Sequence, residues 1–339
     1  MKSKFLFIIT SIILFSCKEI DNPVPQVVES YDVIVLNEGN FRSGNASVSL
    51  YSNTGKVLDK VFQSNNNGRP LGDIAQSMIE KNGKAYIVIN NSNKIEVLDI
   101  KTFQSVGSIT GLNSPRYILP VGGDKAYVSD LYQDEIHVVD LESLAVLKTI
   151  ETKGWTEEMV LVNDKAFVCQ VDSDQVWVFD VNEDTLMQKI NTNVSPLSIC
   201  KDINNQVWVS CSGGFNLGFP AVIQINSNSL QVEKKLEIKD ENKSISNLKI
   251  NSDQDELYYL SEELYKFSIS DTSLPSAPFI SSQNRNFYDF GIEPVNGGVY
   301  IADAIDYQQS GVIYQYNTIG QEIGNFRVGL IPGYIHFKE

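Results

Sequence analysis

A unit of about 41 residues recurs along most of the chain, and this repeat limits the possible fold more than any other feature. In the copy from Gly123 to Ile150, the segments KAYVSD, EIHVVD and AVLKTI alternate β-branched or aromatic residues with other types. Such alternation over five or six residues is typical of strands joined by short polar turns. The first of these segments has counterparts at intervals of 41, 40, 41, 50 and 42 residues, which begin at Lys84, Lys125, Lys165, Gln206, Glu256 and Gly298.

This period, combined with strands and turns, is typical of a β-propeller. A propeller blade takes roughly 40 to 45 residues, whereas the turn of a hexapeptide β-helix is far shorter. A helical solenoid has a similar period, but the units lack apolar residues at i, i+3, i+4 and i+7. An earlier copy begins at Tyr31 and raises the number of units to seven. The sequence therefore predicts an all-β fold, a single seven-bladed β-propeller.

The first unit contains too few strands for a complete blade. Residues 31–37, 46–51 and 57–62 supply three strands, whereas a blade needs four. The C-terminal segment LIPGYI from Leu330 resembles LNSPRYI from Leu112, which opens the third unit. We therefore expect the C-terminus to supply the innermost strand of blade one and to close the ring, with His336 in a structural role.

The N-terminus carries the features of an export signal. A basic start, an apolar run from Phe5 to Phe15 and a small residue precede Cys17. The run is too short to span a bilayer, which takes roughly 20 residues. Leu-Phe-Ser-Cys resembles a bacterial lipobox, which implies lipidation of Cys17. We expect a signal peptide over residues 1–16, a lipidated tether over 17–30 and the propeller over 31–339, with an ordinary signal peptide as the alternative.

Composition argues against several classes of function. A net charge of −15 disfavours binding to nucleic acids or anionic lipids, because such binding relies on clustered Lys and Arg. Besides Cys17 there are three cysteines, Cys169, Cys200 and Cys211. An odd number is a poor disulfide framework, and Cys169 and Cys211 lie at the ends of equivalent strands, so we expect these two to be buried thiols.

Few residues suit catalysis. The chain has two histidines, too few for a histidine cluster that binds metal, and His137 lies within a strand. Asp99, Asp140 and Asp180 recur at one place in successive units and are expected to cap turns. Asp130 and Asp303 occupy equivalent strand ends, and paired carboxylates can hydrolyse glycosides. We expect no enzyme activity, no cofactor and no metal, with a hydrolase as the least favoured alternative.

Two motifs resemble known propellers. Tyr-Val-Ser-Asp from Tyr127 and Tyr-Ile-Ala-Asp from Tyr300 are similar to the repeat core of the YVTN, or YncE-like, propeller family. Asn-Glu-Gly-Asn-Phe from Asn37, followed by NASVSLY from Asn45, resembles the first blade of surface lipoproteins of Bacteroidetes. These include BtuG-type proteins, which capture cobalamin and pass it to an outer-membrane TonB-dependent transporter. The resemblance implies a lipoprotein anchored at the outer membrane and exposed on the cell surface, which captures a corrinoid.

One face of the predicted ring is the candidate binding surface. We call it the loop face, because it carries the connections between the second and third strands and between consecutive blades. Aromatic residues there could cover a flat ring, Asn could pair with amides and Arg could bind phosphate. A glycan or a partner protein could use the same aromatic residues. The candidate ligand-binding residues, which include four of the five arginines, are Asn40, Phe41, Arg42, Arg69, Arg116, Tyr132, Trp155, Phe215, Phe219, Arg285 and Tyr307.

Overall fold

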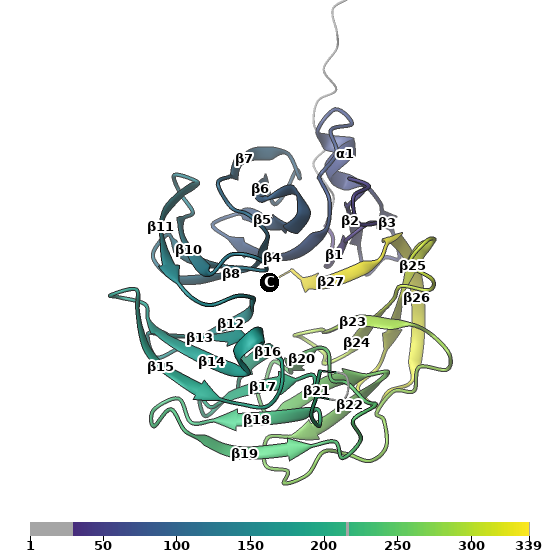
Figure 1. The fold of residues 1–339 in the computed structure, drawn as a ribbon. Helices are drawn as coiled ribbons and strands as arrows, with labels where there is room; N and C mark the ends of the chain where they lie inside the picture. Colours follow the sequence, from purple (N-terminus) through teal and green to yellow (C-terminus); the bar gives the residue numbers. More distant parts are fainter. Residues whose placement is uncertain (1–29, 215–216, 339) are drawn as a thin grey trace, which may run out of the picture.

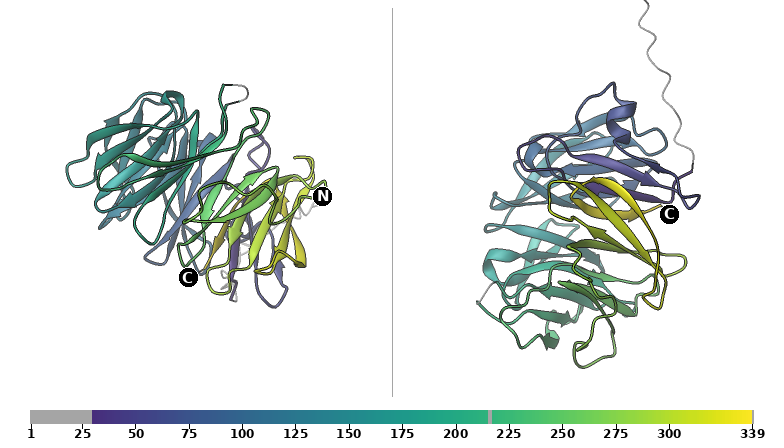
Figure 2. Two further views of the ribbon diagram at one scale, coloured as in Figure 1. Left: turned by 90° about the horizontal axis from the view of Figure 1, so that it is seen from below. Right: turned by 90° about the vertical axis from the view of Figure 1, so that its right-hand side faces the viewer.

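The computed structural model describes residues 30–214 and 217–338, whose strands form seven antiparallel sheets around one axis (Figure 1). The predicted seven-bladed β-propeller is thus confirmed. Residues 1–29, which include Cys17 and nearly all of the expected signal and tether, lie outside the described residues. In edge-on views, the strands of each blade run between the two faces of the ring (Figure 2).

Blades two to five each contain four consecutive strands, from the channel outward. Blade two contains β4 (Ala75–Lys81), β5 (Lys84–Ile89), β6 (Lys94–Asp99) and β7 (Ser105–Ile109). Blade three contains β8 (Pro115–Gly122), β9 (Lys125–Asp130), β10 (Glu135–Asp140) and β11 (Ala145–Glu151). Blade four contains β12 (Thr156–Val162), β13 (Lys165–Gln170), β14 (Gln175–Asp180) and β15 (Thr185–Asn191). Blade five contains β16 (Pro196–Lys201), β17 (Val207–Cys211), β18 (Ala221–Ile225) and β19 (Val232–Glu237).

Turn chemistry explains why the strands end where they do. The β4–β5 hairpin turns at Asn82 and Gly83, both with positive φ (52° and 74°), the conformation that two-residue hairpins favour. At the β10–β11 turn, the Asp140 carboxylate accepts the Ser143 N–H at 2.7 Å. Asp99 and Asp180 accept backbone N–H groups in the same way. The predicted role of these three aspartates as turn caps is confirmed.

The core lies between the blades. The second strand of a blade is buried on both sides, as in β5, where only Lys84 is partly exposed. Tyr86 and Val88 of this strand pack in one cluster with Ala126 and Val128 of blade three. Outermost strands such as β11 are mostly exposed. Each blade therefore buries its apolar residues against its neighbours, and the ring must be complete for every interface to form.

The C-terminal strand closes this ring. β27 (Pro332–Phe337) pairs antiparallel with β1 (Val33–Asn37), with Val35 opposite Ile335, and β2 (Ser47–Tyr51) and β3 (Val57–Leu58) complete the sheet. The predicted closure is confirmed. The strand expected over residues 57–62 ends early, because Lys60 adopts a left-handed conformation with φ of 52° and a short helix, α1 (Val61–Asn65), follows.

Blade six departs from the four-strand pattern. It contains β20 (Leu248–Ile250), β21 (Glu256–Ser261) and β22 (Glu263–Ser268). The following segment contains Pro275 and Pro278, which have no N–H to donate to a ladder, and it touches β22 through one bridge between Leu264 and Ile280. Blade seven regains four strands: β23 (Phe287–Ile292), β24 (Val299–Asp303), β25 (Ser310–Tyr316) and β26 (Glu322–Leu330).

Candidate functional site

A cavity of about 310 Å³ opens where the innermost strands begin, and we call it the channel mouth. Each innermost strand contributes its second residue to the wall of this cavity. The shorter β20 is the exception, since its wall residue immediately precedes the strand. These residues are Gln76, Arg116, Glu157, Leu197, Asn247, Tyr288 and Gly333. Because all seven blades contribute, residues about 40 positions apart meet around one axis.

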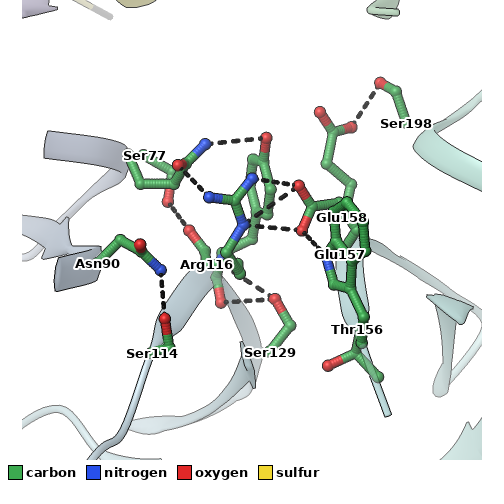
Figure 3. A network of polar contacts seen from close by, with 12 residues as sticks. Ser77, Asn90, Ser114, Arg116, Ser129, Thr156, Glu157, Glu158 and Ser198 are labelled. Carbon is green, nitrogen blue, oxygen red and sulfur yellow. Dashed lines mark hydrogen bonds and ion pairs between the residues drawn. The ribbon is translucent and has the colours of Figure 1, made fainter. Parts of the chain in front are cut away.

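Arg116 is held firmly within the mouth. Its Nε donates to both oxygens of Glu157, at 2.9 and 3.2 Å, and Nη2 completes a bidentate ion pair with the same carboxylate (Figure 3). Nη1 donates to Gln76 Oε1, and the indole N–H of Trp155 reaches Glu157 Oε2 at 2.8 Å. The Glu157 carboxylate raises the pKa of Arg116 further above its usual value, despite burial. The guanidinium of Arg116 is therefore already paired with a carboxylate of the protein.

Two other carboxyls in the mouth form no ion pair within the described part of the chain. Glu38, which follows β1, accepts a hydrogen bond from Tyr288 Oη at 3.0 Å. Glu158 of β12 accepts the Ser198 hydroxyl at 2.6 Å and the Ile199 N–H at 3.1 Å (Figure 3). Burial raises the pKa of each carboxyl to about 7.

Below the mouth lies a second hollow of about 330 Å³, which we call the lower hollow. Tyr117 and Glu158 line both cavities, so the two adjoin. The wall of the lower hollow is mainly apolar and includes Met78, Ile79, Ile118, Leu119, Met159, Ile199, Leu248, Ile250 and Ile335. The wall of the channel is thus less polar in the lower hollow than at the mouth, although Glu158 and Lys249 also line the lower hollow.

Three of the predicted aromatic residues are exposed on connections of the loop face. Phe41 follows β1, Tyr132 follows β9 and Tyr307 follows β24, and they are 60%, 72% and 44% exposed. Asn40 donates to the Tyr307 carbonyl at 2.7 Å and joins the connections of blades one and seven. The Tyr307 ring also meets Tyr288 of the mouth edge to face, with 5.8 Å between centroids. We call Phe41, Tyr132 and Tyr307 the aromatic rim.

The other predicted residues lie in different surroundings. Arg42 is on the same connection as Phe41, with its guanidinium 5.0 Å from that ring. Trp155 is half-buried beside Glu157. The ring centroid of Phe219 lies 5.1 Å from the Lys239 ammonium. Phe215 lies outside the described residues.

Two arginines expected on the loop face lie elsewhere. Arg69 follows α1 and pairs with Glu96 of β6, on the flank of blade two. The helix carries the chain there because Asn65 and Asn66 bond to carbonyls of the β6–β7 turn, on the opposite face. Arg285 stacks 3.7 Å from the Tyr314 ring centroid and pairs with Glu322 at 2.8 Å, along blade seven.

The carboxylates proposed for a hydrolase accept hydrogen bonds from backbone N–H groups. Asp130 is fully buried and accepts the N–H groups of Ser114, Tyr132 and Gln133. Asp303 accepts those of Asn286 and Ile305 in the same way. These bonds stabilise the connections and give both carboxylates a structural role in the turns.

The histidine of blade three and two of the cysteines lie in the core. His137 is buried, with Nε2 3.5 Å from Asp130 Oδ2. Cys169 and Cys211 are buried free thiols in the interface of blades four and five. Within residues 30–214 and 217–338, no three His, Cys, Asp or Glu side chains are grouped so that they could hold a metal ion. In the same part of the chain, no helix has the length and apolar character needed to cross a membrane.

Sequence reasoning found Arg116 but missed most of the mouth. Glu38, Gln76, Glu157, Glu158 and Tyr288 were not among the predicted residues. A signal was available, because most of them recur at the repeat interval from Arg116, at the second position of an innermost strand. When the repeats are aligned on Arg116, the residues that share its position make up most of the mouth.

Solved structures with the same architecture share little sequence with this chain. A periplasmic gluconolactonase of Pseudomonas aeruginosa is 13% identical, with a TM-score of 0.71, over 91% of this chain and 98% of that one. A quinonprotein alcohol dehydrogenase-like protein of Bacteroides thetaiotaomicron is 17% identical, with a TM-score of 0.69, over 91% and 78%. At such identities the likeness shows the fold alone. No curated protein matches the chain.

A family model covers almost the whole ring. It matches residues 31–325, from two residues before β1 to within β26, and therefore spans most of the strands that build the channel. The chain belongs to the family described as "Domain of unknown function (DUF5074)".

Proposed function

We propose that the protein is a capture protein that binds a corrinoid across its loop face and delivers it to an outer-membrane transporter. The observation that carries the proposal is the aromatic rim, whose three exposed side chains come from connections of three blades on one face. Large apolar side chains that are exposed on the same face can jointly contact a large flat ligand. They would contact the flat ring of a corrinoid, while polar neighbours such as Asn40 would meet its amides.

The dimensions favour binding across the face. Ligand pockets for drug-sized molecules measure roughly 300 to 1,000 Å³, and the channel mouth, at about 310 Å³, is at the lower end. A corrin macrocycle with its amide side chains is too wide for it. Of the predicted arginines, Arg42 lies beside the rim and is the candidate for a phosphate contact.

Anchoring through Cys17 and exposure at the cell surface are part of the proposal. They rest on the leader that ends in Leu-Phe-Ser-Cys. Replacing Cys17 by Ala should abolish labelling by a fatty acid and release the protein from the membrane fraction. A variant that stays labelled and membrane-bound would contradict the anchor without affecting the binding proposal.

Calorimetric titration with cyanocobalamin and cobinamide tests the capture. Loss of an aromatic anchor at a binding surface costs on the order of 2 kcal/mol, about thirtyfold in affinity, so we expect weaker binding by Tyr132→Ala and Tyr307→Ala. Val295→Ala, which changes a 91% exposed residue on the β23–β24 turn of the opposite face, is the matched control. No heat with either ligand at micromolar protein would exclude the corrinoid and favour a glycan or a protein partner on the same rim.

A further inference from the structure

The ion pairs around the channel leave a surplus of negative charge. Arg116 is neutralised by Glu157, and Lys249 lies 2.8 Å from Asp289 Oδ1. Lys249 also donates to the Phe290 carbonyl, so its ammonium is held at the wall of the lower hollow. Both cations thus have a carboxylate of their own, whereas Glu38 and Glu158 form no ion pair with any residue that the structure describes.

Each of these two carboxylates keeps one oxygen available. Among the described residues, hydrogen bonds reach Oε2 of Glu38 and Oε2 of Glu158, but none reaches either Oε1. Glu38 belongs to blade one and Glu158 to blade four, so they approach the mouth from well-separated parts of the ring. The mouth therefore presents two unfilled acceptors, already anchored by protein donors, to whatever occupies it.

The surroundings of both carboxylates favour a cationic occupant. Gly333 makes room for the Glu38 carboxylate, because a Cβ at that position would collide with it. Tyr117 and Tyr288, whose rings can attract a cation, line the same cavity. An ammonium group has three donors and no acceptor, which complements two free carboxylate oxygens. A carboxylate or phosphate would meet uncompensated like charge, since the guanidinium of Arg116 is already bound.

We propose that the channel is a binding site for an amphiphilic organic cation, with its ammonium group between Glu38 and Glu158 and its apolar part in the lower hollow. The lower hollow adjoins the mouth at Tyr117 and Glu158, so a ligand can reach from the polar region into the apolar one. Its volume of about 330 Å³ accommodates a chain of six carbons. This site lies in the channel and not on the aromatic rim, so it does not depend on corrinoid binding.

Three ligands that differ in the head group test the proposal. Calorimetric titration at pH 8 with n-hexylamine, 1-hexanol and hexanoate compares a cation, a neutral group and an anion on one apolar chain. We expect hexylamine to bind at least about tenfold more tightly than hexanol, and hexanoate to give no heat. Equal affinity for amine and alcohol would overturn the proposal, because charge would then play no part.

Substitutions locate the head group. Glu38→Gln and Glu158→Gln keep the shape and the hydrogen bonds to Tyr288 and Ser198 but remove the charge, and each should weaken hexylamine binding at least about tenfold. Glu142→Gln, at an exposed residue of the β10–β11 turn, should leave affinity unchanged. Circular dichroism of each variant verifies the fold, and unchanged affinity in folded Glu38→Gln and Glu158→Gln would disprove the site.

The outcome is separable from the test of the proposed function. Tyr132→Ala should weaken corrinoid binding and leave hexylamine binding intact, because Tyr132 does not line the channel. Glu158→Gln should have the opposite effect. If corrinoids fail to bind while hexylamine binds, the rim proposal falls and the channel proposal stands.

Discussion

Glu38 shows how one residue of the channel mouth depends on its neighbours. Its carboxyl accepts a hydrogen bond from Tyr288, and Arg116 and Asp289 are the charged groups that act on it with opposite signs. Burial outweighs the favourable contacts and raises its pKa to about 7. The folded protein therefore holds a proton on Glu38 at pH values where the unfolded chain has released it.

This raised pKa makes stability depend on pH. The folded pKa exceeds the unfolded one, so the contribution of Glu38 to stability is complete below about pH 4.5 and is lost as the pH rises through 7. Glu38→Gln removes the ionisation. The free energy of unfolding of Glu38→Gln minus that of the wild type should therefore increase from pH 5 to pH 8, by up to roughly 3 kcal/mol.

Urea unfolding at pH 5, 6, 7 and 8 measures this difference. Glu142→Gln, on the exposed β10–β11 turn, serves as the control and should track the wild type at every pH. A difference between Glu38→Gln and the wild type that stays constant with pH would show that Glu38 titrates in the usual range.

Among the elements, β2 and β26 illustrate how neighbouring blades are joined. Tyr51 and Phe326 stack across blades one and seven, with centroids 4.0 Å apart and ring planes within 5°. This contact lies at the junction where the two ends of the propeller meet. It supplements the ladder between β1 and β27, since both stabilise the same blade.

A double-mutant cycle measures the stack. Tyr51→Leu and Phe326→Leu should each destabilise the protein, and their combination should cost less than the sum by about 0.5 to 1.5 kcal/mol. Tyr51→Leu combined with Phe267→Leu, a change in blade six, should be additive. If the effects of Tyr51→Leu and Phe326→Leu on the free energy of chemical unfolding were additive, the two rings would stabilise the protein only through the area that each buries.

The elements also show what the sequence could and could not predict. The interval between Lys-Ala-Tyr copies predicted seven blades, and the likeness between the Leu112 and Leu330 segments predicted the closing strand. The missing outer strand of blade six was not foreseen, because an interval of 42 residues between Glu256 and Gly298 leaves room for a fourth strand. Pro275 and Pro278 were the available warning.

At single residues the repeat was less informative. It placed Arg116 on the loop face, but it could not show that Glu157 would neutralise it, since that pair joins two blades. Arg69 and Arg285 were assigned by loop position alone, whereas their long side chains reach Glu96 and Glu322 on blade flanks. The partner that a long side chain chooses depends on packing between repeats, which spacing within a repeat does not encode.

For the whole molecule, stability depends on closure. β27 supplies the ladder to the inner edge of β1, and Tyr334 Oη donates to the Met78 carbonyl of blade two at 3.2 Å. Deleting residues 330–339 would open the ring between blades and expose the edge of β1. We expect the midpoint of thermal unfolding to fall by about 10 °C or more.

Differential scanning calorimetry of the truncated and complete proteins checks this expectation. Removal of Glu339 alone is the control and should leave the midpoint unchanged. If the truncated protein unfolded at the same temperature as the complete protein, the remaining interfaces would be sufficient to hold the ring without β27.

The pairing of β1 with β27 also sets the order in which the protein can be made. Blade one is the first to emerge during synthesis, yet its inner strand follows nearly 300 residues later, after the six other blades. Until the chain has been made as far as Phe337, β1 has an open backbone edge that another newly made chain could occupy. A ribosome that stops within blade seven would therefore release a product with blades two to six formed and both the first and the seventh incomplete, which is a substrate for chaperones and proteases.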